Sequence, residues 1–493
     1  MIANGGDHQR MYVLALDQGT TNSKALLIDA ATGAVVRKSV KPVGVQHIGP
    51  DRVEQDGEKI WSSIVSAAAE CLDQIHAWAL RGITISSQRE SVAVWDAKTG
   101  HLLGPVIGWQ DNRTADECRR LASSADRVRA MTGLELDPMY SASKMRWLVN
   151  HSDLKQDANI HIGTIDTFLI ERLTGNHLTE PGNASRTLLF DIEMGAWSEE
   201  LCDLFEVPSA LLPRVVSSEG DFGVTRRGLP IPPGVPILAV LADSHAALYL
   251  HSRGRDRIAK ATYGTGTSVM AVVPKPDAAS AVASTIAWAN PDPVYAAEGN
   301  ILASGAALEL MAQLITDGDI ALLGELAVKA GSSEGVSFVP ALSGLGAPYF
   351  DRSASGIIDG INGGITKAHL ARAAFEAVVQ QVTDVVEALE SQGTVEIEQL
   401  YVDGGASSSR FLMELQARVL QRPVLISSIE EASALGAALF ACHSHQLAGP
   451  TGWSLKLPTI VDPPQSESQV SRRQWRRAVD RSRGRSILAE DDY

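Results

Sequence analysis

A turn rich in glycine and threonine separates two apolar, strand-like segments at two places in this 493-residue chain. The first copy is LALDQGTTNSKALLID (14–29), and the second is the segment 258–273, in which YGTGT divides two apolar runs. A single turn of this kind is commonly an ordinary hairpin connection. Two copies, each in its own half of the chain, favour a nucleotide held between two related domains. Neither copy matches the GxxxxGK[ST] phosphate loop.

The rest of the chain alternates strand-like and helical patterns. Residues 58–78 carry apolar side chains at helical spacing and are followed by strand-like runs at 82–87 and 91–96. In the second half, a long amphipathic helix is predicted over 370–389, before a strand at 400–403. This order predicts an α/β fold with parallel strands. The chain is also too long for one ordinary hydrophobic core, so we expect at least two domains.

A polar, charged connector, SRGRDR (252–257), marks the expected domain boundary. We expect a disordered lead-in, an N-terminal domain, a C-terminal domain and a C-terminal extension, over residues 1–10, 11–252, 253–450 and 451–493 respectively.

Composition excludes several classes of function. The formal net charge of −15 argues against nucleic-acid binding through a general electrostatic footprint, and an arginine-rich segment near the C-terminus is expected to be a solvated helix face. No helix-turn-helix segment precedes residue 11, so a DNA-binding repressor is disfavoured. The four cysteines are far apart, which favours a reducing cytoplasm over a disulfide framework. No apolar run is long enough to span a membrane.

The two turns are suited to binding phosphate. Glycine permits close approach of the backbone, while hydroxyl and successive N–H groups form a concave anion site. Asp17 cannot bind phosphate directly, because both groups are anions, but a carboxylate can hold Mg²⁺ against phosphate oxygens. We therefore expect Mg²⁺ at Asp17. The phosphate-binding candidates in the turns are Thr20, Thr21, Asn22, Lys24, Thr265 and Gly266.

Several segments resemble the FGGY family of carbohydrate kinases, and within that family the glycerol kinases are the most similar. The resemblance extends from about residue 11 to residue 450, and residues 356–376 fit the second signature pattern of the family throughout. The other matching segments are ALDQGTT (15–21), ISSQRE (85–90), GWQDNR (108–113), NASRTLLFDI (183–192), ATYGTGT (261–267), PALSGLGAPYFD (340–351) and VDGGASSSRFLMELQ (402–416).

The resemblance implies two actin-like, ribonuclease H-like domains around an interdomain cleft. It implies transfer of the γ-phosphate of ATP to a hydroxyl of a small polyol or sugar. Family members place phosphate contacts at Thr20, Thr21 and Lys24. The nucleotide contacts fall at Thr265, Gly305, Gly405 and Ser409, and Glu309 replaces a glutamine that lies near the base in glycerol kinase.

Each candidate residue on the acceptor side could also have a purely structural role. Asp243 follows an apolar run and could be a helix N-cap, but the family places its general base there. Arg89 and Glu90 could lie in a surface turn, although an adjacent acid and base supply both acceptors and donors for polyol hydroxyls. Trp109 could be a core residue. In glycerol kinases the Arg–Glu pair binds the substrate and the tryptophan forms an apolar wall.

Three positions depart from the glycerol kinase pattern. Met139 replaces a tyrosine, with Tyr140 beside it; Ser244 replaces a glutamine and Ser268 a phenylalanine. We include all four in the substrate-binding set. The changes predict a roomier, more polar pocket, and hence glycerol or a longer polyol or ketose of four or five carbons. A buried site built for one hydroxyl pattern discriminates against others.

Two further expectations complete the sequence-based interpretation. A homodimer or homotetramer is expected, with a small polyol or sugar as the acceptor and no nucleic-acid or membrane partner. The alternative function is a non-catalytic actin-like or chaperone-type ATPase module that uses the same nucleotide clamp. The polyol-binding candidates favour the kinase, because a mechanical ATPase does not need them.

The segment 225–236 lacks the glycine- and arginine-containing inhibitor loop of some glycerol kinases.

Overall fold

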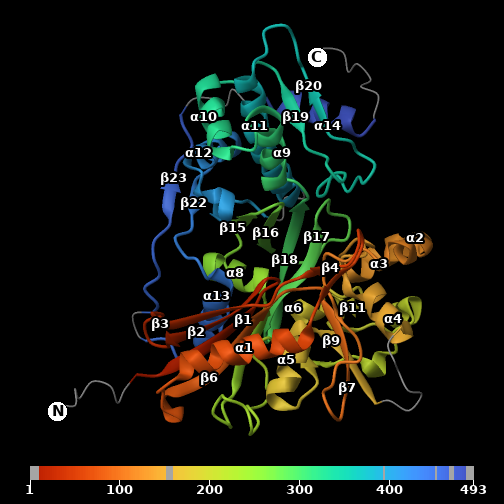
Figure 1. Ribbon diagram of the computed structural model, residues 1–493, viewed down its shortest axis with the longest axis vertical. Coiled ribbons are helices and arrows are strands. Elements are labelled where there is room, and N and C mark those ends of the chain that lie inside the picture. Colours follow the sequence, from red (N-terminus) through yellow and green to blue (C-terminus); the bar gives the residue numbers. More distant parts are fainter. Residues whose placement is uncertain (1–9, 152–158, 392–394, 450–451, 466–470, 485–493) are drawn as a thin grey trace, which may run out of the picture.

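The two turn motifs lie at equivalent places in two separate sheets. The computed structural model describes residues 10–151, 159–391, 395–449, 452–465 and 471–484 (Figure 1). Residues 1–9 of the predicted lead-in lie outside this part of the chain. The N-terminal sheet has the order β14-β6-β1-β2-β3. Its strands are β1 (Tyr12–Gln18), β2 (Asn22–Asp29), β3 (Val35–Pro42), β6 (Leu80–Ser87) and β14 (Ile237–Ala242).

The C-terminal sheet has the order β17-β18-β16-β15-β21-β22-β23. β15 pairs antiparallel with β16 and parallel with β21, as β1 pairs antiparallel with β2 and parallel with β6. The predicted strand–turn–strand units are therefore confirmed in both halves. The strands are β15 (Ile258–Tyr263), β16 (Thr267–Val273), β17 (Ala283–Asn290), β18 (Asp292–Ile301), β21 (Gln399–Asp403), β22 (Val424–Ile426) and β23 (Thr459–Val461).

Helices cover both faces of the N-terminal sheet, which explains why β1 and β14 are buried at every position. Leu14 and Leu16 face one side, with α1 (Gly57–Leu72) and α5 (Ile165–Thr174). The alternate residues, Val13 and Ala15, face the other side, with α8 (Asp243–Ser252) and α13 (Ala432–Ser444). The helix predicted from residue 58 is confirmed, but it ends at Leu72 rather than continuing to residue 78.

Helices α8 and α13 lie between the two sheets (Figure 1). They cross closely, since a Cβ on Gly436 would lie 1.9 Å from the carbonyl oxygen of Ala246. The far face of the C-terminal sheet packs against α9 (Gly305–Ile315), α11 (Lys367–Glu390) and α12 (Arg410–Leu420). The long helix predicted near 370–389 is therefore confirmed as α11. Helix α13, which belongs to the second half of the chain, packs into the hydrophobic core of the first half.

A smaller sheet and a terminal helix complete the parts used below. The sheet has the order β4-β5-β8-β7-β9, with β4 (Gln46–His47), β5 (Val53–Gln55), β8 (Val106–Ile107), β7 (Val92–Asp96) and β9 (Ile160–Thr164).

In the C-terminal helix α14 (Arg472–Ser482), Trp475 is 3% exposed and its Nε1 donates to Asp384. The helix expected to be solvated is thus half-buried, because its few non-arginine side chains share one face.

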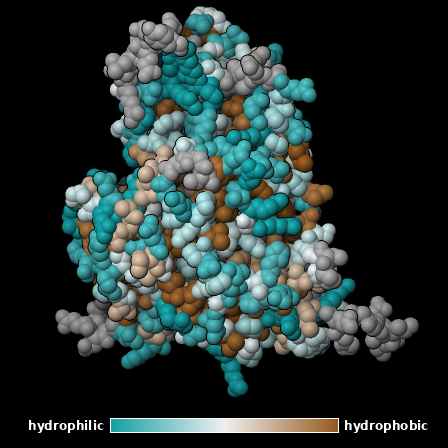
Figure 2. All heavy atoms as spheres, turned by 180° about the vertical axis from the view of Figure 1, so that it is seen from behind, coloured by the Kyte–Doolittle hydropathy of each residue, from teal (hydrophilic) through white to brown (hydrophobic). Residues whose placement is uncertain are grey.

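Hydrophobic residues occur in small groups among hydrophilic ones on the face seen in Figure 2. Among the residues that the structure describes, no helix combines the length and apolar character needed to cross a membrane.

Candidate active site

Both turn motifs border one cavity of about 1200 Å³ between the two halves of the chain. The cavity brings together twelve of the predicted site residues, which are contributed by both sheets. These are Asp17, Thr20, Lys24, Arg89, Glu90, Trp109, Met139, Asp243, Ser244, Thr265, Gly266 and Ser268.

Seven predicted residues do not border this cavity: four of them line a second cavity, and the other three are Thr21, Asn22 and Tyr140. Thr21 is exposed in its turn, where its carbonyl accepts from the N–H of Val43 and its hydroxyl from Asn22 Nδ2. Tyr140 is only 4% exposed and lies beneath the guanidinium of Arg186, 5.1 Å from the ring centroid. Burial raises the pKa of Tyr140 to about 12. Tyr140 is therefore placed to support Arg186.

A second cavity, of about 920 Å³, shares Gly264 and Thr265 with the first. The remaining predicted nucleotide residues line it: Gly305, Glu309, Gly405 and Ser409. The N-terminus of α9 fixes the shared turn, because the N–H of Gly305 donates to the carbonyl of Gly264 at 3.0 Å. A Cβ on Gly305 would lie 2.6 Å from that carbonyl oxygen. Only glycine allows the turn and the helix to approach this closely.

Asp17 lies at the end of β1 and is 6% exposed. Ser86 donates to its Oδ1 at 2.7 Å, and Lys24 Nζ lies 3.8 Å from its Oδ2. Burial raises the pKa of Asp17 to about 6, while the Ser86 hydrogen bond and the Lys24 charge act in the opposite direction. A carboxylate at the edge of a cavity that contains both phosphate-type turns fits a hard cation such as Mg²⁺.

Lys24 connects the two halves of the chain. Its ammonium lies 2.6 Å from Glu431 Oε2, and Lys38 also pairs with Glu431. Burial opposes the charge on Lys24, but its bond with Glu431 raises the pKa above the ordinary value. Lys24 is therefore positively charged at the border of the cavity, as a phosphate contact requires.

Arg89 and Glu90 belong to a buried network rather than to a surface turn. The guanidinium of Arg89 makes two bonds of 2.8 Å to Glu298, and Arg186 Nε donates to Glu90 at 2.7 Å. Arg186 Nη1 also lies 2.9 Å from Glu298. Burial opposes ionisation of Glu298, but the charges of Arg89 and Arg186 outweigh it and hold its pKa well below the usual range. Two arginines and two glutamates thus balance each other beneath the cavity.

The backbone at Glu90 has φ = 60°, a left-handed conformation that is uncommon for residues other than glycine. Such strain is concentrated at functional sites. Nearby, Trp109 is half-buried and its Nε1 donates to Thr20 Oγ1 at 3.1 Å. Its ring borders the cavity rather than filling the core. This bond joins the acceptor-side tryptophan to the first phosphate-type turn.

Asp243 is the first residue of α8, directly after β14. Its carboxylate accepts from the N–H of Ser244 at 2.6 Å, and no side-chain bond caps the helix. Its Oδ1 lies 4.0 Å from Arg89 Nε, and its side chain is 32% exposed towards the cavity. Burial raises the pKa of Asp243, while the charge of Arg89 acts in the opposite direction. The plain N-cap interpretation therefore does not explain this residue.

Sequence reasoning missed several charged residues at the site. Glu298 and Lys260 lie within apolar strands, and Asp403 is the last residue of another, β21. Lys260 Nζ is 4.0 Å from Asp403, and both border the cleft. The sequence did contain one indication of these residues. An ionisable side chain inside an otherwise apolar strand is buried, and a buried charge needs a partner of opposite charge. Arg186 and Glu431 offered no such local signal.

Among the described residues, His161, Glu171 and His177 have potential ligand atoms within 4.8 Å of one another. The two imidazoles are stacked, with centroids 3.8 Å apart and an interplanar angle of 5°. Their in-plane lone pairs therefore run parallel and do not converge on one ion, as a tetrahedral site requires. Glu171 lies 2.9 Å from His161 Nδ1, and burial lowers the pKa of His177 to about 3. These residues form a hydrogen-bonded pair stacked on a neutral histidine.

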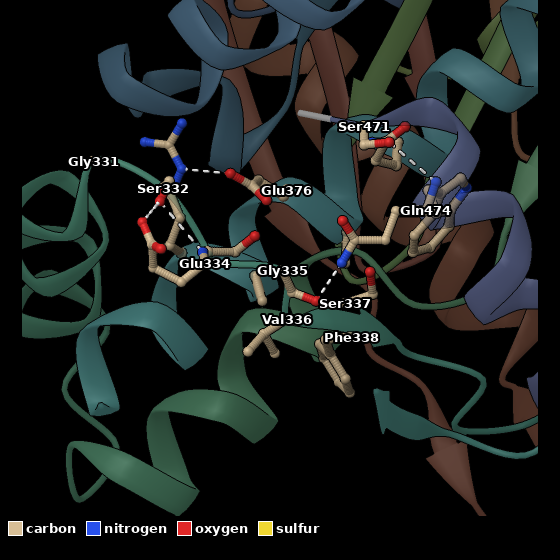
Figure 3. A pocket seen from close by; sticks show the side chains of 16 residues that line it. Gly331, Ser332, Glu334, Gly335, Val336, Ser337, Phe338, Glu376, Ser471 and Gln474 are labelled. Atoms are coloured by element: carbon tan, nitrogen blue, oxygen red, sulfur yellow. Dashed lines mark hydrogen bonds and ion pairs between the residues drawn. The ribbon is translucent and has the colours of Figure 1, made fainter. Parts of the chain in front are cut away.

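A third cavity, of about 250 Å³, lies between the loop 331–338, α11 and α14 (Figure 3). Several of its polar groups bond to one another: Arg372 Nε donates to Glu376 at 2.7 Å, and Gln474 donates to the carbonyl of Gly335. No predicted site residue borders it.

Comparison with known proteins gives the family. Residues 12–249 match the N-terminal domain of the FGGY family of carbohydrate kinases, and residues 259–445 match its C-terminal domain. An apulose kinase of Pectobacterium atrosepticum is 39% identical over 496 residues, covering 96% of this chain and 98% of the relative. A glycerol kinase of Aquifex aeolicus is 40% identical, covering 86% of this chain and 88% of the relative.

Among solved structures, a Plasmodium falciparum glycerol kinase with ADP has a TM-score of 0.85 at 25% identity, covering 96% of this chain and 98% of that one. A xylulose kinase of Lactobacillus acidophilus has a TM-score of 0.83 at 21% identity, covering 96% and 97%, and shows the same fold. The fold is the expected pair of actin-like, ribonuclease H-like domains. The chain belongs to the FGGY family of carbohydrate kinases.

Proposed function

We propose that this ATP-dependent carbohydrate kinase phosphorylates a polyol or ketose of four or five carbons, with Asp243 as its general base. The observation that carries the proposal is the common cavity, which is bordered by Asp243, by Arg89 and by both phosphate-type turns. An acceptor beside Asp243 and a triphosphate along the turns would meet in this space. The second cavity, which shares Gly264 and Thr265 with the first, would hold the rest of the nucleotide.

In the reaction, the acceptor hydroxyl attacks the γ-phosphorus as its proton passes to the Asp243 carboxylate. A new O–P bond forms, the bond to the β,γ-bridging oxygen breaks, and ADP leaves with the electron pair. Burial raises the pKa of Asp243, which makes it a stronger base than a solvated aspartate. The charge of Arg89, 4.0 Å away, opposes this rise in pKa, and its guanidinium orients the acceptor.

Mg²⁺ would be held through Asp17, whose carboxylate borders the cavity. When bound, the ion neutralises phosphate charge and orients the triphosphate for transfer. Lys24, Thr20 and Thr265 would contact phosphate oxygens from both sides of the cleft. Phosphate would then compete with Glu431 for the Lys24 ammonium.

Two small serines support an acceptor larger than glycerol. Ser244 and Ser268 border the cavity where glycerol kinases have a glutamine and a phenylalanine, and Met139 stands in place of a tyrosine. Trp109 would form an apolar wall for the carbon chain. The similarity to an apulose kinase over nearly the whole chain is consistent with an acceptor other than glycerol. The comparisons also support a kinase rather than a non-catalytic ATPase module.

The test is ADP release measured with glycerol, erythritol, threitol, ribitol, xylitol, D-ribulose and D-xylulose as acceptors. We expect ADP release that depends on the acceptor, with a higher kcat/KM for at least one four- or five-carbon compound than for glycerol. A clear preference for glycerol would overturn the assignment of a longer acceptor. ADP release independent of every acceptor would contradict transfer to a polyol or ketose.

A further inference from the structure

We propose that Asn300 and Ser268 form a polar subsite of the acceptor cavity that binds a hydroxyl or carbonyl group which glycerol lacks. This subsite would make Asn300 a specificity-determining residue for acceptors with more than three carbons. The inference rests on the proposed function, because it concerns the same cavity. It adds a residue for which the sequence comparison with glycerol kinases gave no indication.

The two residues are direct neighbours in the C-terminal sheet. Ser268 on β16 pairs with Asn300 on β18 in the antiparallel register, so both side chains point to the same face. Glu298 is two residues before Asn300 and shares that face, because side chains alternate along a strand. Ser268 and Asn300 both border the cavity. β18 therefore carries both Glu298, which pairs with Arg89, and Asn300, which lies on the same face of the strand as Glu298.

The side chains of Ser268 and Asn300 differ in their hydrogen bonds to the rest of the protein. Ser268 Oγ donates to Glu298 Oε1 at 2.8 Å. Within the described ranges, no hydrogen bond from another residue reaches the side-chain amide of Asn300, which is half-buried at the cavity wall. An amide offers two donors and one acceptor oxygen. An acceptor hydroxyl can use both kinds of group, and a carbonyl can use the donors.

The backbone of Asn300 is held firmly, while its side chain has no hydrogen-bond partner in the part of the chain that the structure describes. Its carbonyl accepts from the N–H of Ala347 at 3.0 Å, and a Cβ on Gly346 would lie 2.1 Å from its oxygen. On the other side, a Cβ on Gly266 would lie 2.3 Å from the carbonyl oxygen of Ile301. Glycines thus allow two loops to pack tightly on this strand. The backbone that carries Asn300 is therefore pre-organised and loses little freedom on binding, which favours selectivity.

The polar groups of Asn300 and Ser268 at the cavity wall determine which class of ligand group can bind there. Asp243, Arg89 and Glu90 already supply groups for the hydroxyls of a three-carbon polyol. The Asn300–Ser268 wall adds neutral polar groups and no charge, so it suits a hydroxyl or carbonyl rather than a carboxylate or phosphate. The additional group would be on a fourth or fifth carbon, or on a branch.

The experiment compares kcat/KM of the wild-type enzyme and of Asn300→Ala for glycerol, erythritol, D-ribulose and D-xylulose. For the best four- or five-carbon acceptor, we expect a decrease of about 10- to 100-fold, the effect of leaving one polar group of the substrate unpaired. For glycerol, the change should stay within about threefold. Asn300→Asp, which keeps the shape but replaces the amide donors with a second acceptor oxygen and a negative charge, should resemble Asn300→Ala for the ketoses.

Gln110→Ala is the matched control, because Gln110 is another amide on the border of the same cavity but is exposed, in the N-terminal half. It should affect all acceptors to the same extent. Equal losses for glycerol and the longer acceptors in Asn300→Ala, or no loss for any, would overturn the subsite. If the wild-type enzyme uses longer acceptors well and Asn300→Ala does not discriminate, only the subsite fails. If the wild-type enzyme prefers glycerol, the proposed acceptor fails with it.

Discussion

Arg89 and Glu298, which are 209 residues apart in the sequence, face each other in a two-point ion pair with both N–O distances at 2.8 Å. The pair joins the loop after β6 in the first half to β18 in the second. Glu298 is 1% exposed, so Arg89 is held against a buried charge while its Nε lies near Asp243. The geometry of the proposed acceptor site therefore depends on how the two sheets are placed against each other.

Glu298→Gln should weaken both the site and the fold. The change leaves Arg89 and Arg186 close together without the carboxylate that neutralises them, and breaking a buried ion pair costs about 3–5 kcal/mol. We expect a lower melting temperature and a raised KM for the acceptor, with a smaller change in the KM for ATP. Thermal denaturation and steady-state kinetics measure the two effects.

Ser268→Ala is the matched control for this prediction, because it removes one hydrogen bond to Glu298 but leaves both arginine pairs intact. Its effect on stability should be about 1 kcal/mol. Equal melting temperatures for Glu298→Gln and the wild-type protein would show that the pair does not stabilise the fold.

Asp243→Asn should fold normally and lose activity by about 10²-fold or more, because asparagine cannot accept the acceptor's proton. Normal folding is expected because the carboxylate does not cap α8 and, among the described residues, accepts a hydrogen bond only from the N–H of Ser244. The measurement is kcat for the best acceptor, together with circular dichroism. Near-native turnover by a folded Asp243→Asn protein would exclude this residue as the base.

Mg²⁺-dependent nucleotide binding should weaken as the pH falls through about 6. Asp17 has a raised pKa of about 6, so its carboxyl is ionised above this pH and protonated below it. A cation binds only the ionised form. Calorimetric titration of the Mg²⁺ complex of a non-hydrolysable ATP analogue, between roughly pH 5 and pH 8, measures this dependence.

Asp17→Asn provides the control, because any pH dependence that it retains belongs to the nucleotide itself. The difference between the two proteins isolates Asp17. Identical Mg²⁺ affinity in both proteins across the pH range would contradict a metal-binding role for Asp17.

Gly305→Ala should destabilise the junction of the two cavities. Its Cβ would clash with the carbonyl oxygen of Gly264 at 2.6 Å, so the shared turn or the start of α9 must move. We expect a lower melting temperature and a KM for ATP raised by about tenfold or more. Gly405→Ala is the comparison: it lines the same cavity, but its Cβ would meet no atom of the described residues within 4 Å.

Gly405→Ala should therefore keep its melting temperature, and any increase in its KM for ATP would come from contact with the nucleotide. A normal melting temperature for Gly305→Ala would show that the turn can adjust without cost.

Local patterns in the sequence predicted much of the fold and of the site. The two strand–turn–strand units, the helix α11 and the order of α and β elements all follow from the spacing of apolar residues. The motifs around Asp17, Arg89 and Asp243 indicated a kinase of this family. These features are decided by residues close together in the chain, because turn chemistry and periodicity act over a few residues.

Other features depend on contacts between distant segments. Tyr140 supports Arg186 instead of bordering the cavity, and α13 packs against the N-terminal sheet although it belongs to the second half.

The sequence by itself determined that a turn rich in glycine and threonine occurs in each half and that the motifs of a carbohydrate kinase are present. Only the tertiary structure decided that Glu298 holds Arg89 and that Asn300 borders the cavity, with no partner for its amide among the described residues. The physical reason is that a buried charge is stable only with a partner, and that partner is chosen by the packing of two sheets. No local pattern encodes this choice.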